Sequence, residues 1–232
     1  MAPAPLSADT PFPAPLSADP TLDEVRQALI AGVASNAAFD GWGPAAVRTA
    51  AQQHGVDADI ARLAFTAGAT AMIDAWFAHI DTMMAQRLPA DVLATMKIRQ
   101  RITALVEARL AIVAPDRESL RRALAILAMP QNLPLAARLG WRAADAMWRL
   151  AGDTATDFNH YTKRLTLSAV YGSTMVAFLD DDSDDWADTR TFLARRIDGV
   201  MRFEQWKAKA KLRREHLPSL TRFIGRLRYP GV

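Results

Sequence analysis

Apolar residues recur every three or four positions along most of the chain, the spacing that places them on one face of a helix. The pattern begins after Thr21, which together with Glu24 forms the capping-box signature of a helix start. Val25, Leu29 and Val33 then follow at helical spacing. No segment shows a convincing alternation of apolar and polar residues, which would be typical of a half-buried strand. The sequence therefore predicts an all-α fold.

Further segments with helical spacing continue to about residue 200. They lie at residues 69–80, 98–113, 120–127, 141–148, 158–179 and 192–200. Prolines and an acidic run at residues 180–188 separate them, because proline cannot continue a helix and clustered like charges disfavour one. We therefore expect a helical bundle over this part of the chain.

The first three predicted helices have the order and lengths of a helix-turn-helix module. Pro44 opens the second helix, Gly55 ends it, and Asp57 caps a short third helix. A helix that reads DNA needs basic side chains to neutralise phosphates, yet the third helix offers only Arg62, close to Asp57 and Asp59. We therefore expect a vestigial module and do not expect DNA to be the main partner.

The two ends of the chain differ from its middle in composition. Residues 1–20 hold six prolines, no Lys or Arg, and the segment PAPLSAD twice, which favours a disordered arm and not a targeting signal. Residues 201–232 hold nine basic residues against two acidic ones, whereas the remaining chain has 19 basic and 23 acidic residues. The basic tail is therefore the part expected to seek an anionic surface.

The basic tail also has an amphipathic pattern. At 100° per residue, Leu220, Phe223, Ile224 and Leu227 share one helix face, opposite two arginines. Upstream, Phe203 and Trp206 stand among lysines and arginines. This pattern indicates a helix lying in a membrane interface; the alternative is a helix packed on the body with its charges in water.

Residues that could carry catalysis are scarce. The chain has no cysteine and only four histidines, and it lacks HExxH, GxSxG and the glycine-rich loops that bind phosphates. Two possible ligands, Asp157 and His160, are too few for a metal site. We therefore expect no enzyme activity, no metal and no cofactor.

Two longer stretches are informative together. Residues 151–171 read AGDTATDFNHYTKRLTLSAVY and residues 186–197 read WADTRTFLARRI. Both resemble the COQ9 family of ubiquinone-biosynthesis proteins. The resemblance implies a TetR-like helical bundle, a homodimer formed through its last core helices, an apolar cavity for an isoprenoid lipid or quinone intermediate, and the demethoxyubiquinone hydroxylase as partner. It also implies a non-enzymatic role, in which the protein presents the quinone intermediate at a membrane surface.

The resemblance divides the chain into four parts. We expect a disordered arm at 1–20, a helix-turn-helix-like module at 21–66, a lipid-binding and dimerisation domain at 67–200, and the basic tail at 201–232. The side chains expected to line the lipid cavity are Trp141, Met147, Trp148 and Tyr171, which are bulky or adaptable.

The expected partner surface follows the family motif. It comprises Asn159, His160, Tyr161, Lys163 and Arg164. His160 stands where the family pattern has Trp, which places the strength of docking in question. Helical spacing puts His160, Lys163 and Arg164 on one cationic face, so Arg164 is expected to dominate the contact. Tyr161 points about 100° away and is expected to be buried with Phe158 and Leu165.

Two other functions remain open at this point. A TetR-like fold would also suit a ligand-responsive transcription regulator, and the chain could serve as a dimeric scaffold without a lipid. Because the proline-rich arm replaces the transit peptide of mitochondrial members, we expect a bacterial protein of the cytoplasm, peripheral on the inner face of the plasma membrane.

Overall fold

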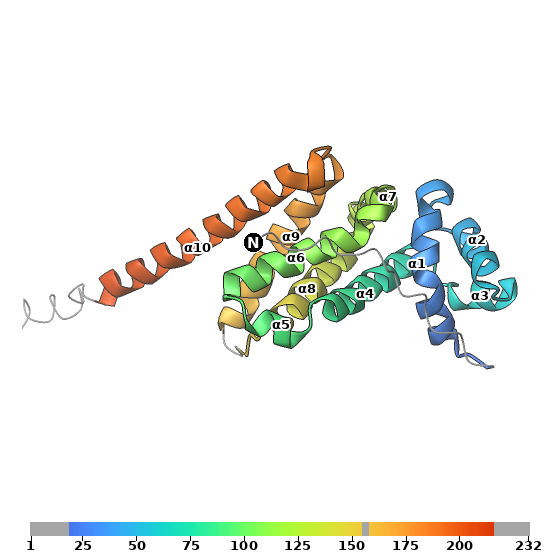
Figure 1. Ribbon diagram of the computed structural model, residues 1–232, viewed down its shortest axis with the longest axis horizontal. Helices are drawn as coiled ribbons and strands as arrows, with labels where there is room; N and C mark the ends of the chain where they lie inside the picture. Colours follow the sequence, from blue (N-terminus) through green and yellow to red (C-terminus); the bar gives the residue numbers. More distant parts are fainter. Residues whose placement is uncertain (1–18, 155–157, 216–232) are drawn as a thin grey trace, which may run out of the picture. The chain divides into compact units, whose positions relative to one another are not determined.

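In a computed structural model, the residues described are 19–154 and 158–215, apart from the side chains of Phe158, Met201 and residues 203–215. The helices there are α1 (Leu22–Asp40), α2 (Pro44–His54), α3 (Ala58–Ala64), α4 (Ala69–Arg87), α5 (Ala90–Ala94), α6 (Ile98–Val113), η1 (Ala114–Asp116), α7 (Arg117–Leu127), η2 (Pro130–Asn132), α8 (Leu133–Leu150), α9 (Phe158–Leu179), η3 (Asp184–Trp186) and α10 (Ala187–Glu215) (Figure 1). No strand occurs in these ranges, so the predicted all-α class is confirmed. Two compact units divide the chain, Met1–Asp180 and Asp181–Val232.

The helix-turn-helix order predicted for α1 to α3 is present, with the expected caps. The Thr21 hydroxyl accepts the Glu24 amide at 3.3 Å, and the Glu24 carboxylate accepts the Thr21 amide at 2.8 Å. Gly55 ends α2 with φ of +65°, a left-handed conformation that glycine adopts without strain. The Asp57 carboxylate accepts the first free amides of α3. Local sequence signals therefore set these helix boundaries.

Buried side chains join this module to the rest of the first unit. Trp42, just ahead of α2, lies 5.2 Å from Trp76 of α4, ring centre to ring centre. Its indole N–H donates to the Ser119 carbonyl at 3.0 Å, and the Ser119 hydroxyl donates to the Ala34 carbonyl at 2.5 Å. The module therefore packs on α4 and α7 through α1, which Figure 1 shows beside these two helices.

Helices α8 and α9 form an antiparallel pair. Trp148 donates to the Lys163 carbonyl at 3.1 Å, whereas nearer the start of α8 the Gly140 carbonyl accepts the Ser168 hydroxyl at 2.9 Å. Arg117 and Arg121 of α7 donate to carbonyls in the last turn of α9, where the helix dipole is negative. Hydrogen bonds therefore join α8 and α9 along their length, and α7 holds the C-terminal end of α9.

In the second unit, the Asp181 side chain accepts hydrogen bonds near the start of α10. Its carboxylate accepts the amide and hydroxyl of Thr189 and those of Ser183. Desolvation would raise the pKa of Asp181, but these hydrogen bonds outweigh it and hold the pKa well below its usual range.

Within the described ranges, no single helix has both the length and the apolarity to cross a membrane. Helices α3 and α4 reach that length and composition only as a pair bent by 87°.

Candidate functional site

The start of α9 holds the motif that suggested a partner surface, and ion pairs with Asp145 of α8 and with Asp153 organise it. Arg164 is 2 % exposed, and its Nε lies 2.6 Å from an Asp145 carboxylate oxygen. Its Nη1 lies 3.2 Å from Asp153, whose other oxygen lies 2.7 Å from the Lys163 ammonium. Both cations of the motif are therefore neutralised by neighbouring carboxylates.

This arrangement corrects two geometric expectations. Arg164 was expected on the surface, but Asp145 and Asp153 draw its guanidinium into the α8–α9 contact. Tyr161 was expected to be buried with Leu165, but the two side chains are 61 % and 66 % exposed. The reason is the rotation of α9 about its own axis. The face that carries Arg164 turns toward α8, and Leu165, which lies about 100° further around the helix, therefore points toward solvent. Phe158, the third member of that expected cluster, has no described side chain.

An aromatic cluster occupies the outward face instead. The Trp141 ring centre lies 6.4 Å from that of His160 and 6.0 Å from that of Tyr161, and His160 and Tyr161 are 5.2 Å apart. Asn159 is exposed beside them. Further along α9, Val176 is 59 % exposed. We call the face formed by Trp141, His160, Tyr161, Leu165 and Val176 the α8–α9 surface; it is aromatic and apolar, not cationic.

The four residues expected to bind lipid do not share one wall. Met147 and Tyr171 are buried, whereas Trp148 is half-buried with the Lys163 ammonium 5.3 Å from its ring centre. Trp141 belongs to the α8–α9 surface. The Tyr171 ring centre lies 4.9 Å from the guanidinium carbon of Arg109. The structure thus separates two interior candidates from two at the periphery, and their role in lipid binding stays a prediction.

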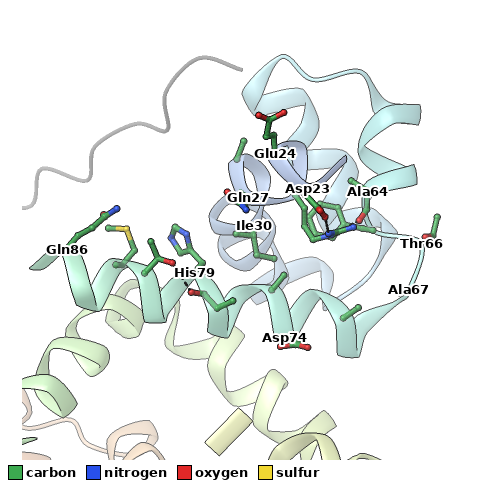
Figure 2. A pocket seen from close by; sticks show the side chains of 18 residues that line it. Asp23, Glu24, Gln27, Ile30, Ala64, Thr66, Ala67, Asp74, His79 and Gln86 are labelled. Carbon is green, nitrogen blue, oxygen red and sulfur yellow. Dashed lines mark hydrogen bonds and ion pairs between the residues drawn. The ribbon is translucent and has the colours of Figure 1, made fainter. Parts of the chain in front are cut away.

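A groove of about 860 Å³ lies between α1, α4 and the α3–α4 turn, and the sequence did not suggest it (Figure 2). Small side chains line one side, at Ala67 in the α3–α4 turn and at Ala71, Ala75 and Ala78 on α4. Their spacing of three to four residues is the signal that could have revealed it, because a row of alanines on α4 leaves room beside α1. Figure 2 places His79 further along α4, where burial lowers the pKa of its imidazole. The lining is mixed, because Asp23, Glu24, Arg26 and Asp74 bring charged groups to the same groove.

The remaining expected sites have different outcomes. In the helix-turn-helix module, Arg62 pairs with Asp59 at 3.2 Å, and α3 exposes Ile60 and Leu63. Of the tail residues, Phe203 and Trp206 lie in α10 with side chains that are not described. The others, Leu220, Phe223, Ile224 and Leu227, lie outside the described residues, as do residues 1–18 of the arm and Asp157 of the rejected metal pair. The membrane role of the tail stays a prediction.

Comparison with solved structures identifies the fold. A crystal structure of a TetR transcriptional regulator from Nitrosomonas europaea matches with a TM-score of 0.60 over 75 % of this chain and 95 % of that chain, at 23 % identity. The predicted TetR-like helical fold is therefore confirmed; at this identity the likeness concerns the fold alone.

Comparison with characterised proteins and families points to one pathway. The rat ubiquinone biosynthesis protein COQ9, mitochondrial, is 42 % identical over 105 residues, which are 45 % of this chain and 34 % of the rat protein. The human protein is 41 % identical over 105 residues, and the Drosophila melanogaster protein 25 % identical over 187 residues, or 79 % of this chain and 57 % of that protein. The match thus spans about a third of the length of the mammalian relatives.

These relatives overturn the expected location. The rat, human and fly proteins are mitochondrial, so the expectation of a bacterial protein at the plasma membrane is wrong. That expectation depended on the composition of residues 1–20, and a short proline-rich arm does not report the compartment of the domain that follows it. The family model COQ9 matches residues 133–204, which include α8 and α9. The resemblance to the COQ9 family indicated by residues 151–171 and 186–197 is confirmed.

Proposed function

We propose that this protein acts in ubiquinone biosynthesis as a non-enzymatic accessory protein. In this role it binds an isoprenoid lipid or quinone intermediate and presents it to the demethoxyubiquinone hydroxylase. The observation that carries the proposal is the COQ9 match over residues 133–204, together with the names of the relatives that match.

The chemistry of the α8–α9 turn supports a binding role. Asp145, Asp153, Lys163 and Arg164 form ion pairs with one another, an arrangement that stabilises the turn. The turn therefore serves to hold the aromatic cluster in place.

The α8–α9 surface supports contact with another macromolecule. Tyr161, Leu165 and Val176 are exposed on it, and tyrosine and tryptophan are enriched among the residues that supply most of the energy at protein interfaces. Two occupants fit the proposal: a second copy of the chain, giving the homodimer, and the hydroxylase. Analytical ultracentrifugation of the chain alone and with the hydroxylase separates the two cases.

Lipid binding has a direct test. An isoprenoid tail gains about 0.8 kcal/mol for each CH₂ group removed from water, so a few isoprene units suffice for tight binding. Mass spectrometry of organic extracts from the purified protein should detect an isoprenoid lipid at a fixed ratio to protein. Extracts without any isoprenoid would favour the dimeric scaffold over the carrier.

The biological role is tested by complementation. In cells that lack their own COQ9, expression of this chain should restore ubiquinone and lower the demethoxy precursor, both measured by mass spectrometry. A chain that folds and reaches the right compartment but restores nothing would contradict the proposal.

The basic tail, residues 201–232, is proposed to bind an anionic membrane surface, at roughly 1 kcal/mol per basic residue near the lipid. Co-sedimentation with vesicles of phosphatidylglycerol and phosphatidylcholine should fall sharply when these residues are deleted, and also at high salt. Unchanged binding after the deletion would favour a tail that packs on the body.

The alternative function is a ligand-responsive transcription regulator, a class of protein that shares the TetR-like fold. The pairing of Arg62 with Asp59 counts against it, because a recognition helix needs free cations for phosphates. A gel-shift assay with promoter DNA distinguishes the two functions.

A further inference from the structure

The groove between α1 and α4 combines apolar walls with room for a ligand. Its volume of about 860 Å³ lies within the range of roughly 300–1,000 Å³ that small-molecule sites occupy. Ile30 of α1 and Phe65 after α3 are buried in its walls, and Ala71, Ala75 and Ala78 place only methyl groups along α4. An apolar chain or ring can therefore lie along α4 without displacing a bulky side chain.

The charged side chains of the lining already have partners within the chain. Arg26 forms an ion pair with Asp23, and the Glu24 carboxylate accepts the Thr21 amide at 2.8 Å. Asp74 forms ion pairs with two arginines of α8. A charged ligand would have to compete with these contacts, so the groove favours an uncharged one.

His79 is the side chain of the lining that is best suited to hold the polar part of such a ligand. It is half-buried, and burial lowers the pKa of its imidazole, so the ring is neutral at neutral pH. A neutral imidazole offers one N–H donor and one nitrogen acceptor. Within residues 19–154 and 158–215, neither ring nitrogen has a hydrogen-bond partner. Figure 2 shows His79 on α4 and Gln27 on α1 among the side chains around the groove, so both ring nitrogens remain for a ligand.

We propose that the α1–α4 groove binds an uncharged amphiphile, with its apolar part along the alanines of α4 and a carbonyl or hydroxyl oxygen at the His79 ring. The quinone intermediate of the proposed function belongs to this class, and the inference rests on that function for the choice of a quinone. An isoprenoid alcohol offers the same chemistry and is the other source. The imidazole N–H donates to either kind of oxygen, whereas the second ring nitrogen accepts only from a hydroxyl.

Titration of the full chain with two uncharged probes tests the site. The probes are decylubiquinone and farnesol, and calorimetry measures their affinity. Ala75→Leu adds a branched side chain where the apolar part of the ligand lies, so it should weaken binding at least about tenfold. His79→Phe keeps a ring but removes both nitrogens, so it should weaken binding roughly fivefold, the value of one hydrogen bond.

Two further measurements test the place and the charge of the ligand. The His79 ring signals in the nuclear magnetic resonance spectrum of the parent should shift when the probe is added, which locates the probe in the groove. The farnesoate anion has the chain of farnesol but a carboxylate in place of the hydroxyl. It should bind more weakly than farnesol, because the charged groups of the lining are already paired.

Ala85→Leu and His54→Phe are the matched controls. Ala85 is half-buried on α4, as Ala75 is, and His54 is exposed at the end of α2; the lining of the groove includes neither. The same substitutions there should leave the affinity for both probes unchanged. Circular dichroism verifies that each variant is folded; if Ala75→Leu fails to fold, His79→Phe still decides.

Weaker binding by the folded groove variants, with shifted His79 ring signals in the parent, supports the site, and the probe affected identifies a quinone or an alcohol as the source. Parental affinity in both variants, unshifted ring signals, no binding of either probe, or tighter binding of farnesoate than of farnesol overturns the inference. If isoprenoid lipid co-purifies while both variants bind like the parent, only the groove site fails. If no isoprenoid is extracted, the proposed function fails, and the titrations still decide the groove.

Discussion

Two buried arginines in the first unit differ in the number of carboxylates that they contact. At the α8–α9 turn, Arg164 contacts two carboxylates, and its Nη1 also donates to the His160 carbonyl at 3.2 Å. At the contact between α4, α6 and α9, Arg109 has one carboxylate partner, Asp81, and its guanidinium carbon lies 4.9 Å from the centre of the Tyr171 ring. A cation between two carboxylates holds two helices in one orientation, whereas a cation with one carboxylate and a ring contributes less to that orientation. Burial alone therefore does not decide how much an arginine stabilises this fold.

The largest effect should follow removal of the fully paired arginine. Arg164→Ala leaves Asp145 and Asp153 without their central cation, so the free energy of unfolding should fall by about 3–5 kcal/mol. Urea denaturation followed by circular dichroism measures it. Arg149→Ala is the control, because Arg149 pairs with the same Asp145 at 2.8 Å but is 73 % exposed, and it should cost less than about 1 kcal/mol. A loss below 1 kcal/mol in Arg164→Ala would remove the contrast between the two arginines.

Substitution on the α8–α9 surface should weaken association without unfolding the chain. Tyr161→Ala removes an exposed ring, and the affinity for the hydroxylase or for a second copy should fall by about 2 kcal/mol, as for a central interface residue. Pull-down and sedimentation measure it. His160→Trp, which restores the residue typical of the family, should keep or strengthen binding. Parental association in Tyr161→Ala, with an unchanged melting temperature, would place the partner surface elsewhere.

Replacement of the partly paired arginine should be mild. In Arg109→Met the side chain stays apolar and extended, and Asp81 keeps its contact with Arg142 at 3.1 Å. Because the substitution also removes a buried charge that has a single carboxylate partner, the free energy of unfolding should change by less than about 1.5 kcal/mol. In the same urea titration, Arg164→Met should lower the free energy of unfolding more than Arg109→Met does. The opposite order would contradict the comparison of the two arginines.

The smallest effect concerns a half-buried acid. Burial raises the pKa of Asp116, although its carboxylate accepts the Ser35 hydroxyl at 2.8 Å. A raised pKa in the folded state means that ionised Asp116 lowers stability at neutral pH, and that this loss disappears as the pH falls below the unfolded value of about 3.9. Asp116→Asn should therefore be more stable than the parent at pH 7, by about 0.5 kcal/mol, and equal to it near pH 3. Thermal melts across this range check the sign, and a gain that grows toward acid pH would contradict it.

Much of the fold was predictable because the signals that begin and end helices are local. Thr21, Gly55 and Asp57 act through hydrogen bonds or backbone angles within a few residues, and each marks the boundary that the sequence indicated. The family motif was equally readable, since its residues are contiguous. The α1–α4 groove was missed because a row of alanines is also compatible with close packing until the neighbouring helix is known.

The sequence by itself determined the all-α class, the helix-turn-helix order and the likeness to COQ9, because periodicity, caps and motifs depend on neighbours along the chain. Only the tertiary structure decided which face of α9 turns inward, and with it the burial of Arg164 and the exposure of Tyr161. It also brought Arg109 beside Tyr171, 62 residues later in the chain. A helical pattern places side chains around one axis, but the rotation of that axis depends on carboxylates such as Asp145 that a different helix supplies.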